Sequence, residues 1–348
     1  MLAVTRRLFR AAPRAQRWLA TTSDIPTKTQ PTIARRAGSD SNTDREADQQ
    51  FSLQWPGATP KTVLIIKKAN DKQVDSALAS ISRWLHREYP QINLVLEPPV
   101  HRQFRHTLPF TRTIPLGVHS EYARTVDFVV TLGGDGTFLH VSSLFPTQVP
   151  PIIPFSMGTL GFLLPFNVSD FQSQLRRVIE GSATLLPRMR LMYAKYSADG
   201  ALNERGLLNI TNEACIHRGT YPHLTTISCY LNDHLLTTSV GDGMIVAPVC
   251  PRSLSFRPLM LPSSSIVKLQ VHRQSRGRAT AYIDGRDCGE LLQGECIEIK
   301  KSPYPLMCVN RDDLAAGWAL DINQLLKFNR TFSYPHEAPF GEHDPDSE

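Results

Sequence analysis

The first half of the chain alternates short, continuously apolar runs with longer segments in which apolar residues recur at helical spacing. Thr62–Ile66 and Asp127–Leu132 are apolar or β-branched runs typical of buried strands, whereas Asp71–Tyr89 carries its apolar residues at helical intervals. Strands that alternate with helices favour a parallel sheet covered on both faces. Further strands are expected over Ile92–Leu96 and Pro151–Phe155, and further helices over Phe138–Phe145 and Val168–Glu180.

From Leu191 onward the pattern changes to short strands separated by turn signals such as Asn232-Asp233 and Asp284-Gly285. The predicted fold class is therefore α/β, with an N-terminal parallel-sheet domain over residues 60–185 and a mostly antiparallel β-rich domain over residues 190–310. A closing segment over residues 311–335 includes a predicted helix, Trp318–Phe328. The strands expected in the second domain are Met192–Tyr196, Leu207–Ile216, Thr225–Leu231, Met244–Ala247, Ile266–His272, Thr280–Ile283 and Cys296–Lys300.

The two ends of the chain differ in composition from its body. Residues 1–23 contain five arginines and no acidic residue, and on a helix the arginines gather on one side opposite leucine, phenylalanine and alanine. This pattern is typical of a mitochondrial transit peptide and predicts a protein of the mitochondrial matrix. The alternative is a basic N-terminus that carries no address. Residues 24–55 and 336–348 are polar and are predicted as a disordered linker and a disordered acidic tail.

Charge and cysteine content exclude several function classes. The net charge is +6, and removing the five N-terminal arginines would leave a body of about +1, which gives no reason to expect nucleic-acid binding. No apolar run reaches the roughly 18 residues of a membrane helix. The six cysteines form no CxxC pair and no zinc-site spacing with histidine, so they are expected to be reduced and mostly buried rather than metal ligands.

The segment most informative about chemistry is Gly133-Gly134-Asp135-Gly136-Thr137, which follows an apolar strand and precedes a predicted helix. Ligands of open α/β sheets bind at the carboxyl ends of strands, where glycines let backbone N–H groups approach a phosphate. Asp135 can accept a hydroxyl proton as a general base, and Thr137 can donate to a phosphate or cap the helix. The loop matches neither GxxxxGK[ST] nor GxGxxG. The alternative is a glycine-rich turn capped by an aspartate.

Four further segments, in order, resemble the NAD kinase family together with this loop. Because GGDGT also occurs in lipid kinases and, in variant form, in phosphofructokinases, the additional segments carry the distinction. The basic N-terminus makes the chain similar in particular to fungal mitochondrial NADH/NAD kinases. The four segments are Phe155–Leu163 (FSMGTLGFL), Thr211–Gly219 (TNEACIHRG), Ser239–Ala247 (SVGDGMIVA) and Pro251–Pro258 (PRSLSFRP).

The resemblance implies an α/β domain followed by a β-sandwich-like domain. It also implies transfer of the γ-phosphoryl group of ATP to the 2′-hydroxyl of the adenosine ribose of NAD(H), with Asp135 as base and a divalent ion (Mg²⁺ or Mn²⁺) assisting. Homo-oligomers are common in the family. The binding residues it implies are Gly133, Gly134, Gly136 and Thr137 for phosphate, Phe162, Asn212 and Glu213 for the dinucleotide, and His223 and Asp242 for further substrate contacts.

Each implied binding residue also has a structural interpretation without a ligand. Asn212 and Glu213 fit solvent-facing strand positions, and His223 fits a surface loop. Asp242 fits a turn before a strand, and Phe162 fits a core position.

The chain departs from the family after Ala247. There the family continues into TPTGSTAYS and a glycine-rich segment, whereas here Pro248 follows directly. The resemblance implies that this loss removes part of the dinucleotide site and uncovers apolar surface. Either the chain is a natural variant, or its coding sequence skips a segment; the intact pattern on both sides favours the second. The alternative functions are a GGDGT-type lipid kinase and a catalytically impaired dinucleotide-binding variant.

Overall fold

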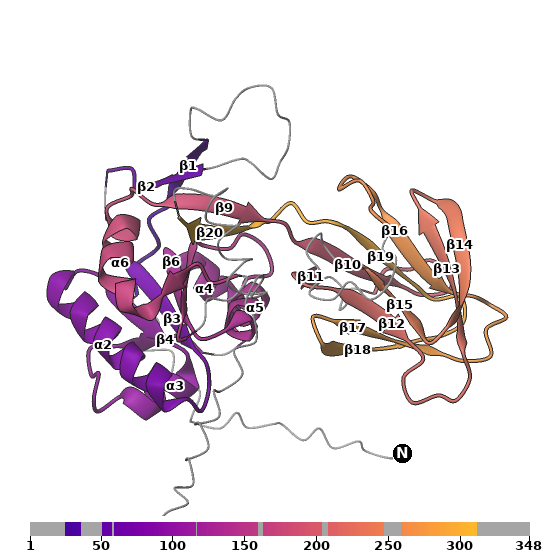
Figure 1. Cartoon of the computed structure of the whole chain (residues 1–348), viewed down its shortest axis with the longest axis horizontal. Helices are drawn as coiled ribbons and strands as arrows, with labels where there is room; N and C mark the ends of the chain where they lie inside the picture. The colour runs from indigo at the N-terminus through magenta and orange to yellow at the C-terminus, as the bar shows by residue number, and fades with distance from the viewer. Residues whose placement is uncertain are drawn as a thin grey trace, which may run out of the picture.

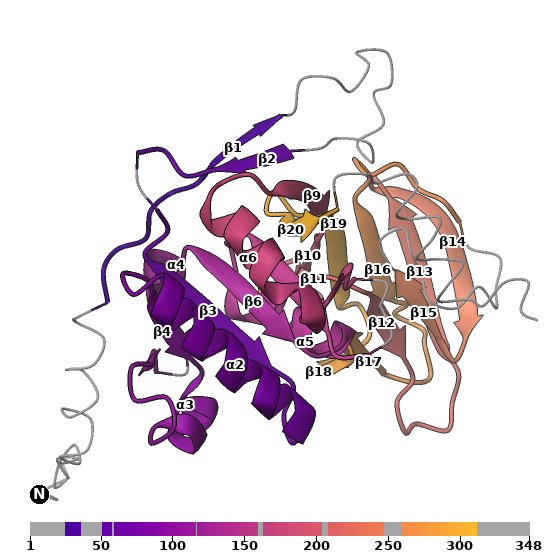
Figure 2. The ribbon, with the colours of Figure 1, turned by 60° about the vertical axis from the view of Figure 1, so that its left-hand side comes forward.

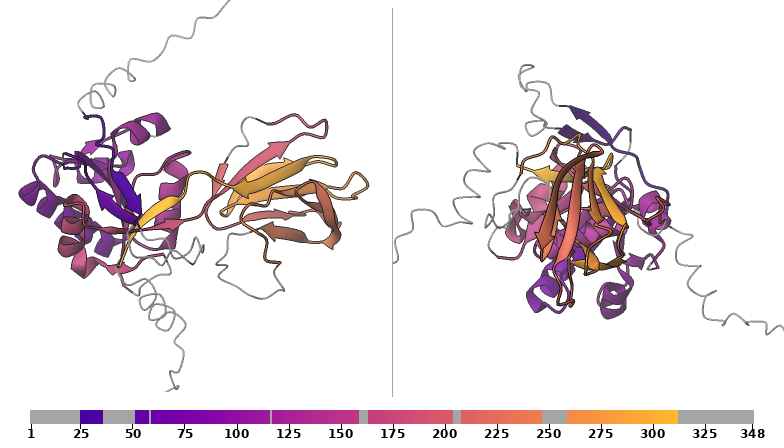
Figure 3. Two further views of the ribbon diagram at one scale, coloured as in Figure 1. Left: turned by 90° about the horizontal axis from the view of Figure 1, so that it is seen from above. Right: turned by 90° about the vertical axis from the view of Figure 1, so that its right-hand side faces the viewer.

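The computed structural model describes residues 25–35, 51–57, 59–115, 117–158, 163–203, 208–246 and 259–311. These residues form two lobes joined by extended connections, an α/β lobe and a β lobe (Figures 1 and 3). The transit peptide, the acidic tail and the closing helix that the sequence predicts lie outside the described residues.

The central strands of the α/β lobe are parallel, as the sequence predicts. β3 (Thr62–Lys67), β6 (Phe128–Leu132) and β7 (Ile152–Ser156) lie side by side and are buried along their whole length. Continuous apolar runs suit such strands because helices cover both faces. The sheet order is β1-β2-β9-β20-β7-β6-β3-β4-β5, where β1 is Thr32–Arg35, β2 is Phe51–Gln54, β9 is Thr184–Arg188 and β20 is Leu306–Asn310. β8 (Phe166–Asn167) pairs with β7. β4 covers Asn93–Leu96 and β5 covers Arg112–Thr113.

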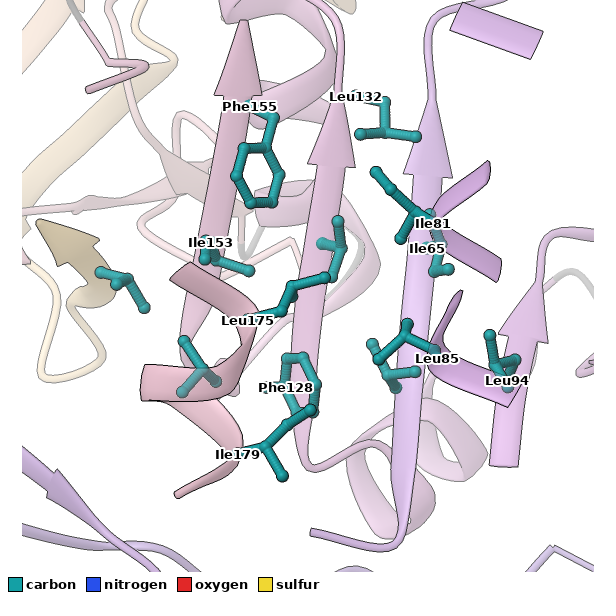
Figure 4. Packing of buried hydrophobic residues seen from close by; sticks show 14 of the residues in the cluster. Ile65, Ile81, Leu85, Leu94, Phe128, Leu132, Ile153, Phe155, Leu175 and Ile179 are labelled. Atoms are coloured by element: carbon teal, nitrogen blue, oxygen red, sulfur yellow. The ribbon is translucent and has the colours of Figure 1, made fainter. Parts of the chain in front are cut away.

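Helices cover both faces of this sheet, and alternate strand residues point to opposite faces. α2 (Lys72–Glu88) and α6 (Phe171–Ile179) pack on one face, where Ile81, Leu85 and Leu175 meet Ile65 and Phe128 (Figures 2 and 4). α3 (Pro98–Phe104) contributes Phe104 to the same core. The opposite face packs α4 (His119–Thr125) and α5 (Asp135–Leu144), and a short 3₁₀ helix, η2 (Val168–Asp170), precedes α6.

The predicted disordered linker over residues 24–55 is wrong where the structure describes it. β1 (Thr32–Arg35) and β2 (Phe51–Gln54) form an antiparallel hairpin, and β2 extends the sheet against β9 (Thr184–Arg188). Ile25 and Leu53 are buried in the two cores of this lobe. Few apolar side chains suffice here because the sheet already supplies their packing partners and a free edge to pair with.

Asp127 fixes the segment before the hairpin to the amino-terminal edge of the sheet. Its carboxylate accepts hydrogen bonds from the backbone N–H groups of Thr29, Lys61 and Thr62, the last two at 2.7 Å. Burial raises the pKa of Asp127 to about 6, although these bonds and Lys28 favour the ionised form.

The stability contributed by Asp127 is expected to fall as pH rises from about 4 to about 6. In that interval the folded protein holds a proton that the unfolded chain releases near pH 3.9, so unfolding becomes easier with rising pH. Relative to Asp127→Asn, which does not titrate, the wild type should lose about 2 kcal/mol of unfolding free energy across this interval. Urea unfolding at several pH values measures the difference. A difference that grows in favour of the wild type would show that the three N–H bonds outweigh burial.

The β lobe consists of two packed antiparallel sheets, which confirms the sandwich-like domain. One sheet has the order β11-β10-β19-β16-β13-β14 and the other β15-β12-β17-β18, with one apolar core formed by residues of both. The strands of the larger sheet are β10 (Leu191–Tyr196), β11 (Leu208–Ile210), β13 (Thr225–Leu231), β14 (His234–Gly241), β16 (Val267–Val271) and β19 (Cys296–Lys301). Those of the smaller sheet are β12 (Ala214–His217), β15 (Gly243–Val246), β17 (Ala279–Ile283) and β18 (Arg286–Leu291).

Two expectations about this region are wrong. The single strand expected over Leu207–Ile216 is interrupted at Thr211–Glu213, so that its halves, β11 and β12, join different sheets. The expected domain boundary near residue 310 is also displaced. β20 (Leu306–Asn310) returns to the α/β lobe, where it pairs with β7 and β9. The chain therefore crosses between the lobes twice, from β9 to β10 and from β19 to β20.

A buried arginine connects both crossings to α5. Arg190 lies between β9 and β10, and its side chain is fully buried. It donates to the backbone oxygen of Tyr304 at 2.6 Å in the second crossing. It also donates to those of Phe145 at 3.1 Å and Thr147 at 2.6 Å, just beyond the C-terminus of α5. Burial lowers the pKa of Arg190 to about 10, which leaves the guanidinium charged at neutral pH.

The remaining sequence expectations concern cysteines and membrane helices. The five cysteines among the described residues are free thiols, and Cys229, Cys296 and Cys308 are buried, as expected. Within the described ranges, no helix has the length and apolar character needed to cross a bilayer.

Large apolar side chains, including Val240 on β14 and Ile245 on β15, are about two-thirds exposed at 64 % and 66 %. The sequence predicts uncovered apolar surface, because the chain lacks the segment with which the family continues after Ala247. Ala247 itself lies outside the described residues.

Candidate active site

The glycine loop lies at the carboxyl end of the central strand β6, where it turns directly into α5. Gly133 has a φ of +152°, a conformation that side chains disfavour. A Cβ atom placed on Gly133 would lie 2.5 Å from Thr137 Oγ1 and 3.0 Å from Lys68 Cβ. Glycine is therefore required at position 133 by both conformation and space, and the loop is packed tightly against the end of β3.

Asp135 is the first residue of α5, and one of its carboxylate oxygens can still accept a hydrogen bond or a proton. Gly134 is the N-cap residue and supplies no side chain to cap the helix, so the free N–H groups of the first turn remain for a ligand. Asp135 Oδ1 is buried and has no hydrogen-bond partner among the residues that the structure describes. A buried acceptor without a partner is costly, which is characteristic of a group that meets its partner in a complex.

The other loop residues differ in how they could meet a phosphate. A Cβ atom on Gly134 or Gly136 would meet nothing within 4 Å, so open space adjoins both positions. Thr137 is 9 % exposed and lies beneath Gly133. The alternative in which Thr137 caps the helix is wrong, because Gly134 occupies that position. The space next to Gly134 and Gly136, rather than the Thr137 side chain, is the open part of the loop.

Two lysines at the end of β3 border this loop, and sequence reasoning missed them. Lys68 donates its backbone N–H to the Leu132 oxygen, and its side chain is 60 % exposed. Lys67 is buried and forms an ion pair of 2.8 Å with Asp75 of α2. The signal was available in the sequence, because a charged pair follows an apolar strand whose carboxyl end faces the same edge as the glycine loop.

Asn212 and Glu213 lie in the break between β11 and β12. The Asp284 carboxylate accepts hydrogen bonds from the backbone N–H groups of Thr211, Asn212 and Glu213, the shortest being 2.7 Å to Asn212. The Asn212 side chain is exposed, and Glu213 is partly buried. Burial, with a smaller effect of Asp284, raises the pKa of Glu213. The sequence signals only a turn at Asp284, so its role in holding this segment could not be inferred.

This segment touches the helix that begins with Asp135. Thr211 Oγ1 donates to Ser142 Oγ of α5 at 2.9 Å, and Asn209 Nδ2 donates to the Pro146 oxygen at 2.6 Å. The structure therefore brings the Asn212–Glu213 segment and the glycine loop to the same helix, although the two segments are far apart in sequence.

The other predicted site residues lie elsewhere or outside the described residues. Asp242 is exposed at the start of β15 and forms an ion pair of 2.6 Å with Arg218. His223 is exposed in the loop before β13. Asp242 lies across from Arg218, beyond the end of β12 that is opposite Glu213, and five residue steps along the strand separate it from Glu213 by about 16 Å. Within one chain, the structure does not group Asp242 with Asn212 and Glu213. Phe162 lies outside the described residues.

Family models match most of the described chain. Residues 63–183 match the ATP-NAD kinase N-terminal domain, and residues 244–311 match the ATP-NAD kinase C-terminal domain. The first match contains the glycine loop with Asp135, and the second contains Asp284.

Individual relatives agree with these matches. The mitochondrial NADH kinase pos5 of Schizosaccharomyces pombe is 35 % identical over 311 residues, which cover 80 % of this chain and 78 % of that protein. The chloroplastic NAD kinase 2 of Arabidopsis thaliana is 35 % identical over 81 % of this chain, which spans only 32 % of that longer protein. The crystal structure of yeast NADH kinase complexed with NADH superposes with a TM-score of 0.73 at 28 % identity, covering 89 % of this chain and 97 % of that one.

Proposed function

Because the chain belongs to the NAD kinase family, we propose that it phosphorylates NAD(H) at the 2′-hydroxyl of the adenosine ribose, with ATP as donor. The observation that carries this proposal is the buried Asp135 oxygen at the start of α5, which has no partner in the described part of the chain and lies beside the open space at Gly134 and Gly136. An acceptor so placed can receive a hydroxyl proton next to a loop that accommodates phosphate.

The proposed reaction is a direct phosphoryl transfer. Asp135 accepts the proton of the 2′-hydroxyl while that oxygen forms a bond to the γ-phosphorus, and the bond from the γ-phosphorus to the bridging oxygen of ADP breaks. The products are NADP(H), ADP and a proton. Gly133, Gly134 and Gly136, with the free N–H groups of α5 and the buried Thr137 beneath them, form the phosphate cradle. Asn212 and Glu213 bind the ribose, and Phe162 the dinucleotide.

His223 and Asp242 take part in this proposal only as further substrate contacts. The distance of Asp242 from Glu213 within one chain requires that Asp242 contacts another part of the dinucleotide or the site of a second copy. Exposed apolar side chains on β14 and β15 support a homo-oligomer, since a second copy would cover them.

A divalent ion is compatible with this loop. The described residues contain no group of three His, Cys, Asp or Glu side chains able to hold a metal by themselves. Mg²⁺ in nucleotide sites is held by one or two carboxylates together with phosphate oxygens and water. Because Asp135, the carboxylate of the loop, is assigned as the base, phosphate oxygens of the nucleotide and water would supply the ligands of the ion. The ion would neutralise charge that develops on the phosphates.

Acceptor specificity tests the proposed function. The purified protein, incubated with ATP and Mg²⁺, should convert NAD or NADH to NADP(H) and should leave diacylglycerol and sphingosine unmodified. Phosphorylation of a lipid alone would instead support a GGDGT-type lipid kinase. NADH binding without turnover would support the impaired variant that the departure after Ala247 suggests.

The basic N-terminus supports import into the mitochondrial matrix, and the S. pombe relative is named as mitochondrial.

Lys68→Met is expected to raise the KM for ATP about tenfold while leaving the KM for NADH nearly unchanged. The Lys68 Cβ lies beside Gly133, and the exposed ammonium group, which pairs with Asp71 at 3.3 Å, can turn to the donor phosphates. A charge-assisted hydrogen bond contributes about 1.5–3 kcal/mol. Initial rates at varied ATP give the effect. Lys61→Met is the matched control, because Lys61 is exposed beside the opposite end of the same strand. Equal effects of the two substitutions would exclude a local role for Lys68.

A further inference from the structure

We propose that Thr211 is a positioning residue for the dinucleotide, because its hydroxyl attaches the Asn212–Glu213 segment to the helix that begins with Asp135. The inference rests on the proposed function, since it assigns to Thr211 the alignment of one part of that site with another. The hydrogen bond from Thr211 Oγ1 to Ser142 Oγ, at 2.9 Å, joins a residue of the β lobe to one of the α/β lobe.

Ser142 is well placed to transmit this alignment along α5. It follows Asp135 by seven residues, which is close to two helical turns, so both residues lie on one face of α5 about 10 Å apart along its axis. Ser142 is itself buried, at 4 % exposure. The segment between β11 and β12 therefore contacts α5 on the same helix face as Asp135. Figures 1 and 2 show α5 beside these strands at the junction of the lobes.

The segment that Thr211 holds behaves as one unit. Three consecutive N–H groups, those of Thr211, Asn212 and Glu213, donate to the Asp284 carboxylate. The Glu213 oxygen in turn accepts from the Asp284 N–H at 3.0 Å. A displacement of Thr211 consequently displaces the two residues that follow it, so the position of the ribose contacts depends on where Thr211 meets α5.

Other contacts between the two lobes hold them in place, so the Thr211 hydroxyl can determine where the Asn212–Glu213 segment lies relative to α5. Arg190 donates to Ser142 Oγ at 3.4 Å and to backbone oxygens just beyond α5. Asn209 contacts the Pro146 oxygen, and its own side-chain oxygen accepts from Ser302 at 2.7 Å. Because Arg190 and Asn209 fix the lobes together, loss of the Thr211 hydroxyl should free the segment from α5, with its bonds to Asp284 intact and without separating the lobes.

Thr211→Val tests the proposal, because it keeps the shape of the side chain and removes the hydroxyl. We expect the KM and the dissociation constant for NADH to rise about fivefold, with the KM for ATP and kcat changed less than twofold. Thr211→Ser should restore both values. Ser142→Ala should reproduce the effect, and the double variant Ser142→Ala/Thr211→Val should be no worse than either single variant. NADH fluorescence titration supplies the dissociation constant independently of turnover.

Thr225→Val is the matched control. Thr225 is a fully buried threonine of the same lobe whose hydroxyl donates to the Arg278 oxygen at 3.0 Å, away from α5. An unchanged NADH affinity in Thr211→Val, or an equal change in Thr225→Val, would overturn the inference while leaving the proposed function intact. A wild-type protein that neither binds nor phosphorylates NADH would overturn the proposed function, and the inference with it.

Discussion

Replacing Asp135 by asparagine is expected to lower kcat for NADP(H) formation by about 10²- to 10⁴-fold, the usual contribution of general-base catalysis. Asparagine retains the size of the side chain but cannot accept the hydroxyl proton. The KM values for ATP and NADH should change little, because the cradle is formed by backbone N–H groups and glycines. Initial rates of NADP(H) formation by the purified variant give the comparison.

Asp170→Asn serves as the control for this substitution. Asp170 is an exposed aspartate of the same lobe, at the end of η2, and lies outside the proposed site. Its replacement should leave kcat within twofold of the wild type. If Asp135→Asn retained most of the activity, another group would have to accept the proton, and the assignment of Asp135 as base would be wrong.

Arg190→Met is expected to destabilise the folded protein by about 3 kcal/mol or more. The guanidinium satisfies the backbone oxygens of Tyr304, Phe145 and Thr147 through one buried and two partly buried hydrogen bonds, and each buried acceptor left without a donor costs about 1–3 kcal/mol. The cost is partly offset because methionine removes the burial of a charge. Urea unfolding followed by tryptophan fluorescence measures the change in unfolding free energy.

Arg278→Met provides the comparison for Arg190. Arg278 forms an exposed ion pair with Glu290 at 3.1 Å, and exposed pairs contribute little to stability. The urea midpoint should therefore move far less for Arg278→Met than for Arg190→Met. Equal midpoints for the two variants would show that water can replace Arg190 and that the joint between the lobes depends on other contacts.

The sequence predicts the elements whose environment is visible in their own residues. β3 and β6 are apolar along their whole length because helices cover both sides, and α2 shows helical spacing because it buries one face. β14 and β18 could not be predicted, since they are edge strands with mostly exposed side chains and no alternating buried face. β2 and β20 depend on partners far away in the sequence, so local pattern carried no sign of their pairing.

The candidate site also contains residues that the local sequence identifies and contacts that only the fold shows. The glycine loop was identified because strand, glycines, aspartate and helix follow one another directly in the chain. Lys68 could have been found, since it directly follows the neighbouring parallel strand β3 at the same sheet edge. The contacts of Thr211 with Ser142 and of Asp284 with the Asn212 N–H join residues about 70 positions apart, and only the folded chain reveals them.

The departure after Ala247 separates family membership from activity. Without the family segment, α5 still carries Asp135 and still contacts the segment that contains Asn212 and Glu213, so the two parts of the proposed site keep a common support in this chain. Binding and turnover should therefore be measured on the same protein preparation.

The most direct measurement is the fate of the γ-phosphoryl group. The protein, supplied with γ-³²P-ATP, Mg²⁺ and NADH, should transfer the label to a product that an NADP-specific dehydrogenase accepts once it is oxidised, with the label at the 2′-position of the adenosine ribose. Asp135→Asn should suppress this product. Label released only as inorganic phosphate, or none leaving ATP although NADH binds, would contradict the proposed dinucleotide kinase.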